Sequence, residues 1–326
     1  MRCSVFPSKE NTNNIKAFLA MFVLAHHIYQ EIPIFEGTVL NTVFLSLGYL
    51  SVAAFLFLSG YGLAYSEKVK GEAYVKDLPV KRISPFFMHI LVLNIIYFFL
   101  YAFLNGKFNF SGLINAVFRN DSLIRNGWYL TVSLMAYIVF YFVYRLIKNT
   151  ALRLLAVSVI FMIYGIACIR VFQFGFWWYE SNFAFVVGLI WGTLYSSNQK
   201  KKSKIIFYAL LLCSITVFVA AFYLVNKYNL SLHIYLFVKG ICSIAFSVSL
   251  ILLGSFLRLQ CKAVSYISKI SFEIYVSQGL FLSLFHSNKI YISNPILYAV
   301  AVAGATIVFA AVLNIVLKKL DNRLIP

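Results

Sequence analysis

The chain has 326 residues, of which 62% are hydrophobic and 12% charged, against about 45–50% and 25% in soluble domains. Its formal charge of +18 at pH 7 comes from lysines and arginines that lie between apolar runs, not in one stripe or tail, which argues against a nucleic-acid partner. These values exclude an ordinary soluble domain and predict an all-α polytopic membrane bundle forming a single domain over residues 1–326.

The first apolar run is interrupted by polar side chains. It follows the polar residues 1–14 and shows no small-residue cleavage site, so we expect a retained helix and not a cleaved signal peptide. On a helix, Lys16, His27 and Glu31 share one face, with Lys16 and His27 about 16 Å apart, while His26 lies about 100° away. Ionisable side chains inside a span usually face protein or water, so this face indicates a function. The alternative, which we weigh equally, is that His26 and His27 lie near the membrane interface and form hydrogen bonds with water.

Ten apolar runs have the length of a membrane span, about 17–25 residues. After the first, they lie near residues 43–65, 83–104, 128–147, 151–170, 177–195, 204–225, 233–257, 264–286 and 294–317. With a cytoplasmic N-terminus, most of the 28 Lys and Arg fall in cytoplasmic loops, as the positive-inside rule requires, and both termini are cytoplasmic. The segment 111–125 reads as an amphipathic piece on the outer surface.

Several spans carry polar residues that allow two interpretations. Ser59 with its neighbouring glycines permits close approach of a ligand, although helix packing is the commoner reason for small residues in membranes. Lys81 and Arg82, which precede the third span, suit lipid headgroups or a soluble anion. Trp128 and Tyr129 open the fourth span, where aromatic residues often form interfacial belts.

The ninth span contains Glu273, Tyr275 and Gln278 within an otherwise apolar run. A charged Glu273 at mid-depth requires a partner or a proton, and Lys269, four residues earlier, is one candidate partner. The five cysteines form no C-x-x-C pair, so neither a disulfide framework nor a metal site is expected.

Five short motifs follow one another along nearly the whole chain: a basic residue and a histidine eleven positions apart (Lys16, His27), F-x-x-x-S-G-Y (Phe55, Ser59, Gly60, Tyr61), R-I-x-P (Arg82, Ile83, Pro85), W-Y-L (Trp128, Tyr129, Leu130) and S-F-x-I-Y (Ser271, Phe272, Ile274, Tyr275). In this order they resemble the acyltransferase 3 family. Two positions depart from the family pattern: Lys16 replaces the usual arginine, and Gln278 stands where many relatives carry histidine. Lysine still binds an anion, but without the guanidinium fork.

The resemblance implies a ten-span enzyme of the bacterial inner membrane. Such an enzyme transfers an acetyl or other short acyl group from cytoplasmic acyl-CoA to a hydroxyl of a surface or secreted glycan, including a lipid-linked glycan. Its partners are acetyl-CoA, the glycan and membrane lipid, with no metal.

The resemblance also implies residue roles. His27 is the expected general base, or less readily an acyl carrier, with His26 and Glu31 beside it. The expected acyl-CoA contacts are Lys16, Lys81, Arg82 and Ser59. The expected acceptor contacts are Trp128, Tyr129, Glu273, Tyr275 and Gln278.

Two other classes of protein fit the same composition. A proton-coupled secondary transporter also has about ten spans and buried ionisable residues, although the chain shows no internal duplication. A glycan polymerase or flippase would act in the same kind of pathway without an acyl donor.

Overall fold

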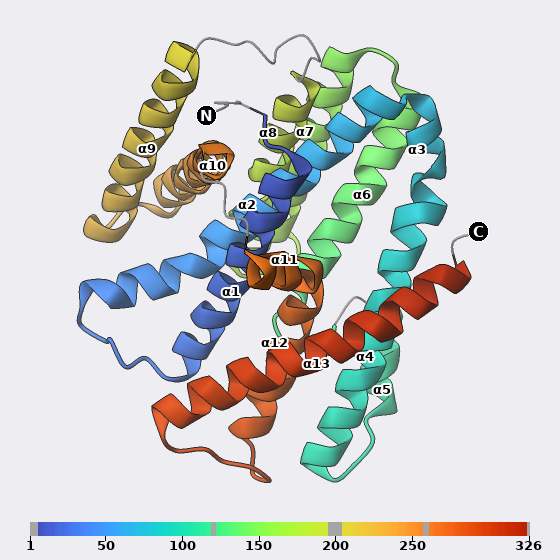
Figure 1. Cartoon of the computed structure of the whole chain (residues 1–326), viewed down its shortest axis with the longest axis vertical. Helices are drawn as coiled ribbons and strands as arrows, with labels where there is room; N and C mark the ends of the chain where they lie inside the picture. Colours follow the sequence, from blue (N-terminus) through green and yellow to red (C-terminus); the bar gives the residue numbers. More distant parts are fainter. Residues whose placement is uncertain (1–5, 119–121, 195–203, 257–260, 325–326) are drawn as a thin grey trace. The chain divides into compact units, whose positions relative to one another are not determined.

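The computed structural model describes residues 6–118, 122–194, 204–256 and 261–324 (Figure 1). Within these ranges the structure is helical between short connections, and its β-type pairing is an isolated bridge between His286 and Tyr291. The elements in order are α1 (Lys9–Glu31), α2 (Val39–Lys70), α3 (Glu72–Leu78), the π-helix η1 (Pro79–Ile83), α4 (Ser84–Asn105), α5 (Phe110–Phe118), α6 (Trp128–Leu146), α7 (Thr150–Arg170), the 3-10 helix η2 (Phe176–Trp178), α8 (Phe183–Thr193), α9 (Lys204–Lys227), α10 (Leu232–Phe256), α11 (Lys262–Lys269), α12 (Ser271–Phe285) and α13 (Pro295–Leu324).

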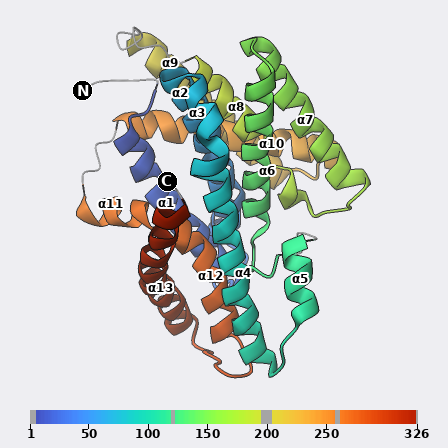
Figure 2. The ribbon, with the colours of Figure 1, turned by 90° about the vertical axis from the view of Figure 1, so that its right-hand side faces the viewer.

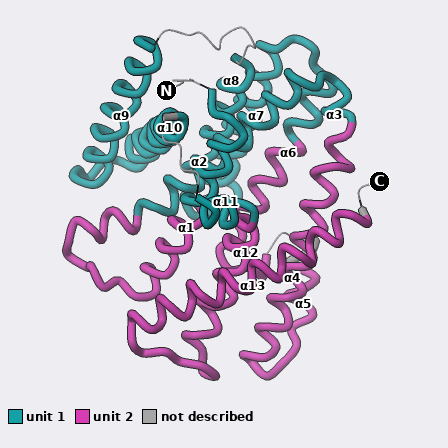
Figure 3. Tube along the Cα trace, viewed as in Figure 1, with its two compact units in different colours: residues 1–19, 46–76, 139–269 teal, residues 20–45, 77–138, 270–326 magenta. Residues whose placement is uncertain are grey.

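The chain divides into two compact units (Figure 3). Unit 1 comprises residues 1–19, 46–76 and 139–269, and unit 2 comprises residues 20–45, 77–138 and 270–326. The boundaries fall inside α1, α2, α3 and α6 and between α11 and α12, so each of the first four helices contributes to both units.

Seven helices of the described chain are long and apolar enough to cross a membrane: α2, the continuous stretch Glu72–Asn105, α6, α7, α9, α10 and α13. The three other expected spans correspond to α1, α8 and α12. With 11 and 15 residues, α8 and α12 are shorter than the roughly 20 that a bilayer core requires, and the first two turns of α1 are polar. A total of ten spans and the cytoplasmic side of both termini remain predictions.

The expected ninth span is divided in the structure. Helix α11 ends at Lys269 and α12 begins at Ser271, with Ile270 between them in a non-helical conformation (φ −113°, ψ 15°). Ile270 is buried, so packing of this apolar side chain stabilises the break. The apolar run at 264–286 contains no glycine or proline at this point, and the sequence therefore gave no sign of two helices.

Glycines bring α2 and α8 into backbone contact within unit 1. A Cβ added to Gly60 would lie 2.2 Å from the carbonyl oxygen of Phe185, and one added to Gly188 would lie 2.1 Å from that of Phe57. The glycine beside Ser59 therefore serves close helix packing, as small residues often do in membrane bundles.

Unit 1 also buries an ion pair inside an aromatic cage. Nζ of Lys239 on α10 lies 2.9 Å from a carboxylate oxygen of Glu180 and 3.1 Å from the hydroxyl of Tyr235. The rings of Tyr49 and Phe176 lie 4.5 and 4.9 Å from the same nitrogen. The carboxylate, the hydroxyl and the two ring faces together replace the interactions with water that the lysine ammonium loses on burial.

Unit 2 is built on α12, which packs against α13 and α4, while α5 packs against α4 (Figure 2). The Tyr97 hydroxyl on α4 donates to the carbonyl oxygen of Val276 on α12 at 3.0 Å. Gly106, with φ at 67°, ends α4 and turns the chain toward α5, as glycine does at many helix ends. Helix α5 overlaps the first half of the expected amphipathic segment, whose residues 119–121 are outside the described ranges.

The Gly60 contact predicts a difference between two neighbouring glycines. Gly60→Ala forces α2 away from α8 and is expected to lower the free energy of unfolding by about 1–3 kcal/mol. Gly62→Ala is the matched control, because a Cβ there meets nothing within 4 Å. Thermal unfolding of both variants in detergent measures the difference, and equal melting temperatures would contradict the packing role of Gly60.

Candidate active site

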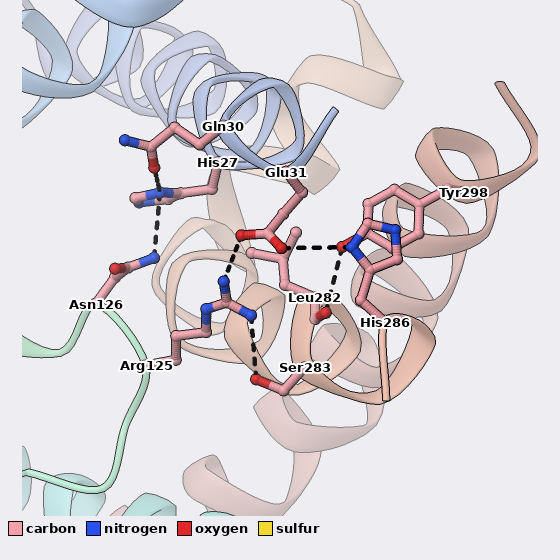
Figure 4. Close-up of polar contacts among 9 residues, drawn as sticks. All are labelled: His27, Gln30, Glu31, Arg125, Asn126, Leu282, Ser283, His286 and Tyr298. Atoms are coloured by element: carbon pink, nitrogen blue, oxygen red, sulfur yellow. Dashed lines mark hydrogen bonds and ion pairs between the residues drawn. The ribbon is translucent and has the colours of Figure 1, made fainter. Parts of the chain in front are cut away.

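His27 is held by two amide side chains that meet the same ring nitrogen (Figure 4). Its Nδ1 lies 2.8 Å from Oε1 of Gln30, one turn further along α1, and 3.1 Å from Nδ2 of Asn126. One ring nitrogen either donates or accepts a hydrogen bond, so one tautomer satisfies Gln30 and the other satisfies Asn126. In both cases Nε2 makes no hydrogen bond to the described residues.

Glu31 joins three segments of unit 2 (Figure 4). One carboxylate oxygen accepts a hydrogen bond from Arg125, and the other lies 3.4 Å from Nδ1 of His286. The His286 ring stacks on Tyr298 of α13, with centroids 3.8 Å apart, and the Tyr298 hydroxyl donates to the carbonyl oxygen of Leu282. The end of α1, the segment before α6 and the end of α12 are thus connected through one carboxylate.

The segment that carries Arg125 and Asn126 is positioned by backbone contacts. Asn126 has a left-handed conformation with φ at 60°, and its carbonyl oxygen accepts a hydrogen bond from the Tyr275 hydroxyl at 2.5 Å. Upstream, the side chain of Asn94 on α4 accepts a hydrogen bond from the N–H of Leu123 at 2.9 Å. Helices α4 and α12 therefore fix the loop that approaches His27.

His26 has a different environment from His27. It is buried, and its Nδ1 lies 2.9 Å from the carbonyl oxygen of Phe44 on α2. This contact ties α1 to α2 and gives His26 a structural role within unit 2. The two adjacent histidines of α1 thus have different partners, since His26 contacts backbone and His27 contacts amide side chains.

The expected acceptor residues do not form one cluster. Tyr275 packs edge-on against Tyr129, with centroids 5.3 Å apart, and Trp128 packs against Tyr129 at 6.3 Å. Glu273, nearer the start of α12, accepts a hydrogen bond from Asn314 of α13 at 2.7 Å. The aromatic residues therefore lie beside the Asn126 loop, whereas Glu273 is engaged with α13.

Gln278 is a buried polar residue in the middle of α12. Its side chain is fully buried, yet neither Oε1 nor Nε2 has a hydrogen-bond partner among the residues that the structure describes. A buried polar group without a partner costs about 1–3 kcal/mol, so this amide is suited to a bound molecule or water.

The expected acyl-CoA residues are divided between the units. In unit 2, Lys81 pairs with Asp77 at 2.8 Å on the surface, and Arg82 lies over the Tyr137 ring and donates to its hydroxyl at 3.2 Å. Lys16 and Ser59 belong to unit 1. The planar guanidinium of Arg82 therefore stacks on an aromatic ring, as arginine side chains often do.

The sequence did not identify Gln30, Arg125, Asn126 or His286. Gln30 lies one turn after His27, and this i, i+3 spacing was a usable signal. The other three lie outside the helical patterns, at the ends of segments far apart in the chain. Among the described residues no cluster of His, Cys, Asp and Glu is able to hold a metal ion.

The Glu31 contacts predict energetic coupling between α1 and the Arg125 segment. A double-mutant cycle of Glu31→Gln and Arg125→Gln is expected to give an interaction energy of about 0.5–3 kcal/mol, since the charged pair is only partly exposed. The interaction energy is measured by unfolding the single and double variants in mixed micelles with increasing concentrations of denaturant. Additive effects of the two substitutions would show that the pair does not hold the segments together.

The left-handed conformation of Asn126 predicts that replacing it by alanine and by glycine gives variants of different stability. Asn126→Ala places a Cβ in the left-handed region and is expected to be about 1 kcal/mol less stable than Asn126→Gly. Both variants lose the contact to His27, so their stability difference reports on the backbone alone. Melting temperatures in detergent check this, and an alanine variant as stable as the glycine variant would rule it out.

A comparison with protein-family models matches an acyltransferase domain over residues 10–315. No curated protein and no solved structure matches the chain. The matched range contains the whole candidate site and all five sequence motifs. The chain is an all-helical membrane protein with several spans, and it belongs to the acyltransferase 3 family.

Proposed function

We propose that this protein is a membrane O-acyltransferase that moves an acetyl or other short acyl group from cytoplasmic acyl-CoA to a hydroxyl of a surface or secreted glycan. The observation that carries the proposal is the His27 imidazole, whose Nδ1 is engaged by Gln30 and Asn126 while Nε2 has no partner among the described residues. The proposed location is the inner membrane of a bacterium, in keeping with the apolar helices and the family.

The contact with Gln30 supports His27 as a general base. When Nδ1–H donates to the Gln30 carbonyl oxygen, the lone pair of the imidazole lies on Nε2. A neutral imidazole with this tautomer accepts a proton from an acceptor hydroxyl placed at Nε2. The Asn126 amide, 3.1 Å from the same Nδ1, favours the opposite tautomer, in which Nε2 carries the proton.

The proposed reaction starts from the tautomer with the proton on Nδ1 and passes through the imidazolium. Nε2 of His27 removes the hydroxyl proton, and the acceptor oxygen attacks the thioester carbonyl carbon. The carbon–sulfur bond then breaks, and the sulfur of coenzyme A leaves with the proton from the imidazolium. The products are the O-acyl ester and the free thiol, and His27 returns to its neutral form.

The remaining residues position the reactants in this proposal. Glu31, through Arg125, holds the segment that presents Asn126 to His27. The amide of Gln278, which has no hydrogen-bond partner within the described ranges, is a donor and acceptor for a polar substrate group. Trp128 and Tyr129 offer aromatic surface to a sugar ring. Lys16, Lys81 and Arg82 supply positive charge for the donor's phosphates, with Ser59 as a further donor contact.

Transfer of label from radiolabelled acetyl-CoA by purified protein in nanodiscs tests the proposal. His27→Gln is expected to lower the rate about 10²–10⁴-fold, the usual contribution of a general base. His26→Gln is the matched control, because a glutamine amide can still donate to the Phe44 carbonyl and the rate should fall by less than tenfold. A fully active His27→Gln variant that is normally folded would refute the role of His27.

Label transfer, together with two further measurements, distinguishes this function from the two other classes of protein. Wild-type protein that neither binds nor turns over acetyl-CoA, but exchanges a solute in vesicles, would be a transporter. Acylation that continues without the protein, while glycan length or translocation changes, would indicate a polymerase or flippase.

A further inference from the structure

The loop before α6, residues 122–127, lies along one face of α12 within unit 2. Tyr275, Gly279 and Ser283 share this face, because residues four apart lie one above the other on a helix. The Tyr275 hydroxyl donates to a carbonyl oxygen of the loop at 2.5 Å, and the Ser283 hydroxyl accepts a hydrogen bond from an arginine of the loop at 3.3 Å (Figure 4). The loop is thus bound to α12 on both sides of Gly279.

Gly279 has no room for a side chain. A Cβ added there would lie 2.7 Å from Cβ of Arg125, 3.0 Å from the Arg125 carbonyl oxygen and 2.4 Å from the Tyr97 hydroxyl of α4. Carbon atoms in ordinary contact lie about 3.5–4.0 Å apart. Tyr97 is fully buried, and its hydroxyl is bound to the carbonyl oxygen of Val276. A methyl group at position 279 therefore displaces the loop, α4 or both.

The same loop holds the His27 ring. Arg125 pairs with Glu31 in the last turn of α1, and Asn126 places its amide nitrogen 3.1 Å from Nδ1 of His27. Hydrogen bonds of this kind span about 2.7–3.2 Å, so a loop shift of about 0.5 Å removes the contact. Of the two amides that fix the plane of the ring, Gln30 alone then remains. A misplacement of about 1 Å can lower the rate of a reaction about 10²-fold.

We propose that Gly279 is a positioning residue for acyl transfer: the absence of a side chain lets the 122–127 loop lie against α12 and so sets the contact of Asn126 with His27. This inference rests on the proposed function, because it concerns the base named there. It also gives Tyr275 the role of holding the loop backbone, in addition to the acceptor contact expected from the sequence. Gly279 acts through the loop and not on the reactants.

Label transfer from acetyl-CoA by Gly279→Ala protein in nanodiscs tests the inference. Its kcat is expected to fall about 10–100-fold. Its KM for acetyl-CoA should stay within about twofold, because none of the expected donor contacts lies on α12. The matched control is Gly304→Ala on α13, where an added Cβ meets nothing within 4 Å and kcat should change less than about twofold. Equal kcat values for these two variants would overturn the positioning role.

A change at Tyr97 separates the loop from α4. Tyr97→Phe removes the hydroxyl nearest to the added methyl group, so Gly279→Ala/Tyr97→Phe keeps the clash with the loop and relieves the clash with α4. Compared with Tyr97→Phe alone, this double variant is expected to have a kcat about 10–100-fold lower, and it replaces Gly279→Ala if that variant does not fold. A kcat equal to that of Tyr97→Phe would show that Gly279 accommodates α4, and the inference would be wrong.

An Asn126→Gly background distinguishes positioning from a general loss of packing. Glycine keeps the left-handed backbone at this position but removes the amide that the loop presents to His27. In this background Gly279→Ala is expected to lower kcat by less than about threefold, because the contact that it disturbs is already absent. A packing defect that is independent of the loop would lower kcat by the same factor in both backgrounds, and this result would contradict the inference.

Hydrogen exchange of the loop amides reports on the loop without turnover. The N–H groups of Leu123 and Gly127 are hydrogen-bonded at 2.9 and 2.8 Å. Gly279→Ala is expected to speed their exchange at least about tenfold, whereas Gly304→Ala leaves it unchanged. Loop amides of Gly279→Ala that are as protected as in the wild type would overturn the inference, even if no label is transferred. Label transfer by wild-type protein reports separately on the proposed function.

Discussion

The carboxylate of Glu31 is the contact on which the geometry of unit 2 depends. It binds Arg125 and approaches His286, so the last turn of α1 is tied to the loop before α6 and to the end of α12. The adjacent Asn126 then reaches His27, four residues before Glu31 on α1. Since a charged group in an apolar bundle requires opposite charge or hydrogen bonds, the three segments meet where these partners are available. The histidine is therefore oriented by the same contacts that satisfy the carboxylate.

Helical periodicity and hydropathy account for what the sequence predicted well. The apolar runs located the long helices, and the 3.6-residue repeat put His27 and Glu31 on one face of α1, where both contact the loop before α6. The breaks of the shorter helices were not predictable, because α11 and α12 meet inside one apolar run and Ile270 carries no turn signal. The length of an apolar run reports only how many consecutive residues are apolar. A helix that contacts protein on all sides does not need the length that spans a bilayer.

The residues that complete the candidate site escaped prediction for a different reason. Arg125, Asn126 and His286 precede or follow helices, where no periodic pattern assigns a side chain to a face. Their contacts with α1 bridge large separations in the chain, and only the folded arrangement of unit 2 brings them together. Asn126 alone had a local indication, since asparagine followed by glycine often occurs in the left-handed turns that it adopts here.

The caged pair of Lys239 and Glu180 in unit 1 has a consequence for biosynthesis. Lys239 is the eighth residue of α10, and an unpaired lysine weakens the entry of a helix into the bilayer by up to about 2.5–3.5 kcal/mol, the cost at the helix centre. Glu180 and the rings of Tyr49 and Phe176 all precede Lys239 in the chain, so they have left the ribosome before α10 does. The order of synthesis thus supplies the counter-charge and the aromatic surface first. Helix α10 can then leave the translocon as part of an assembled polar contact and not as an isolated segment.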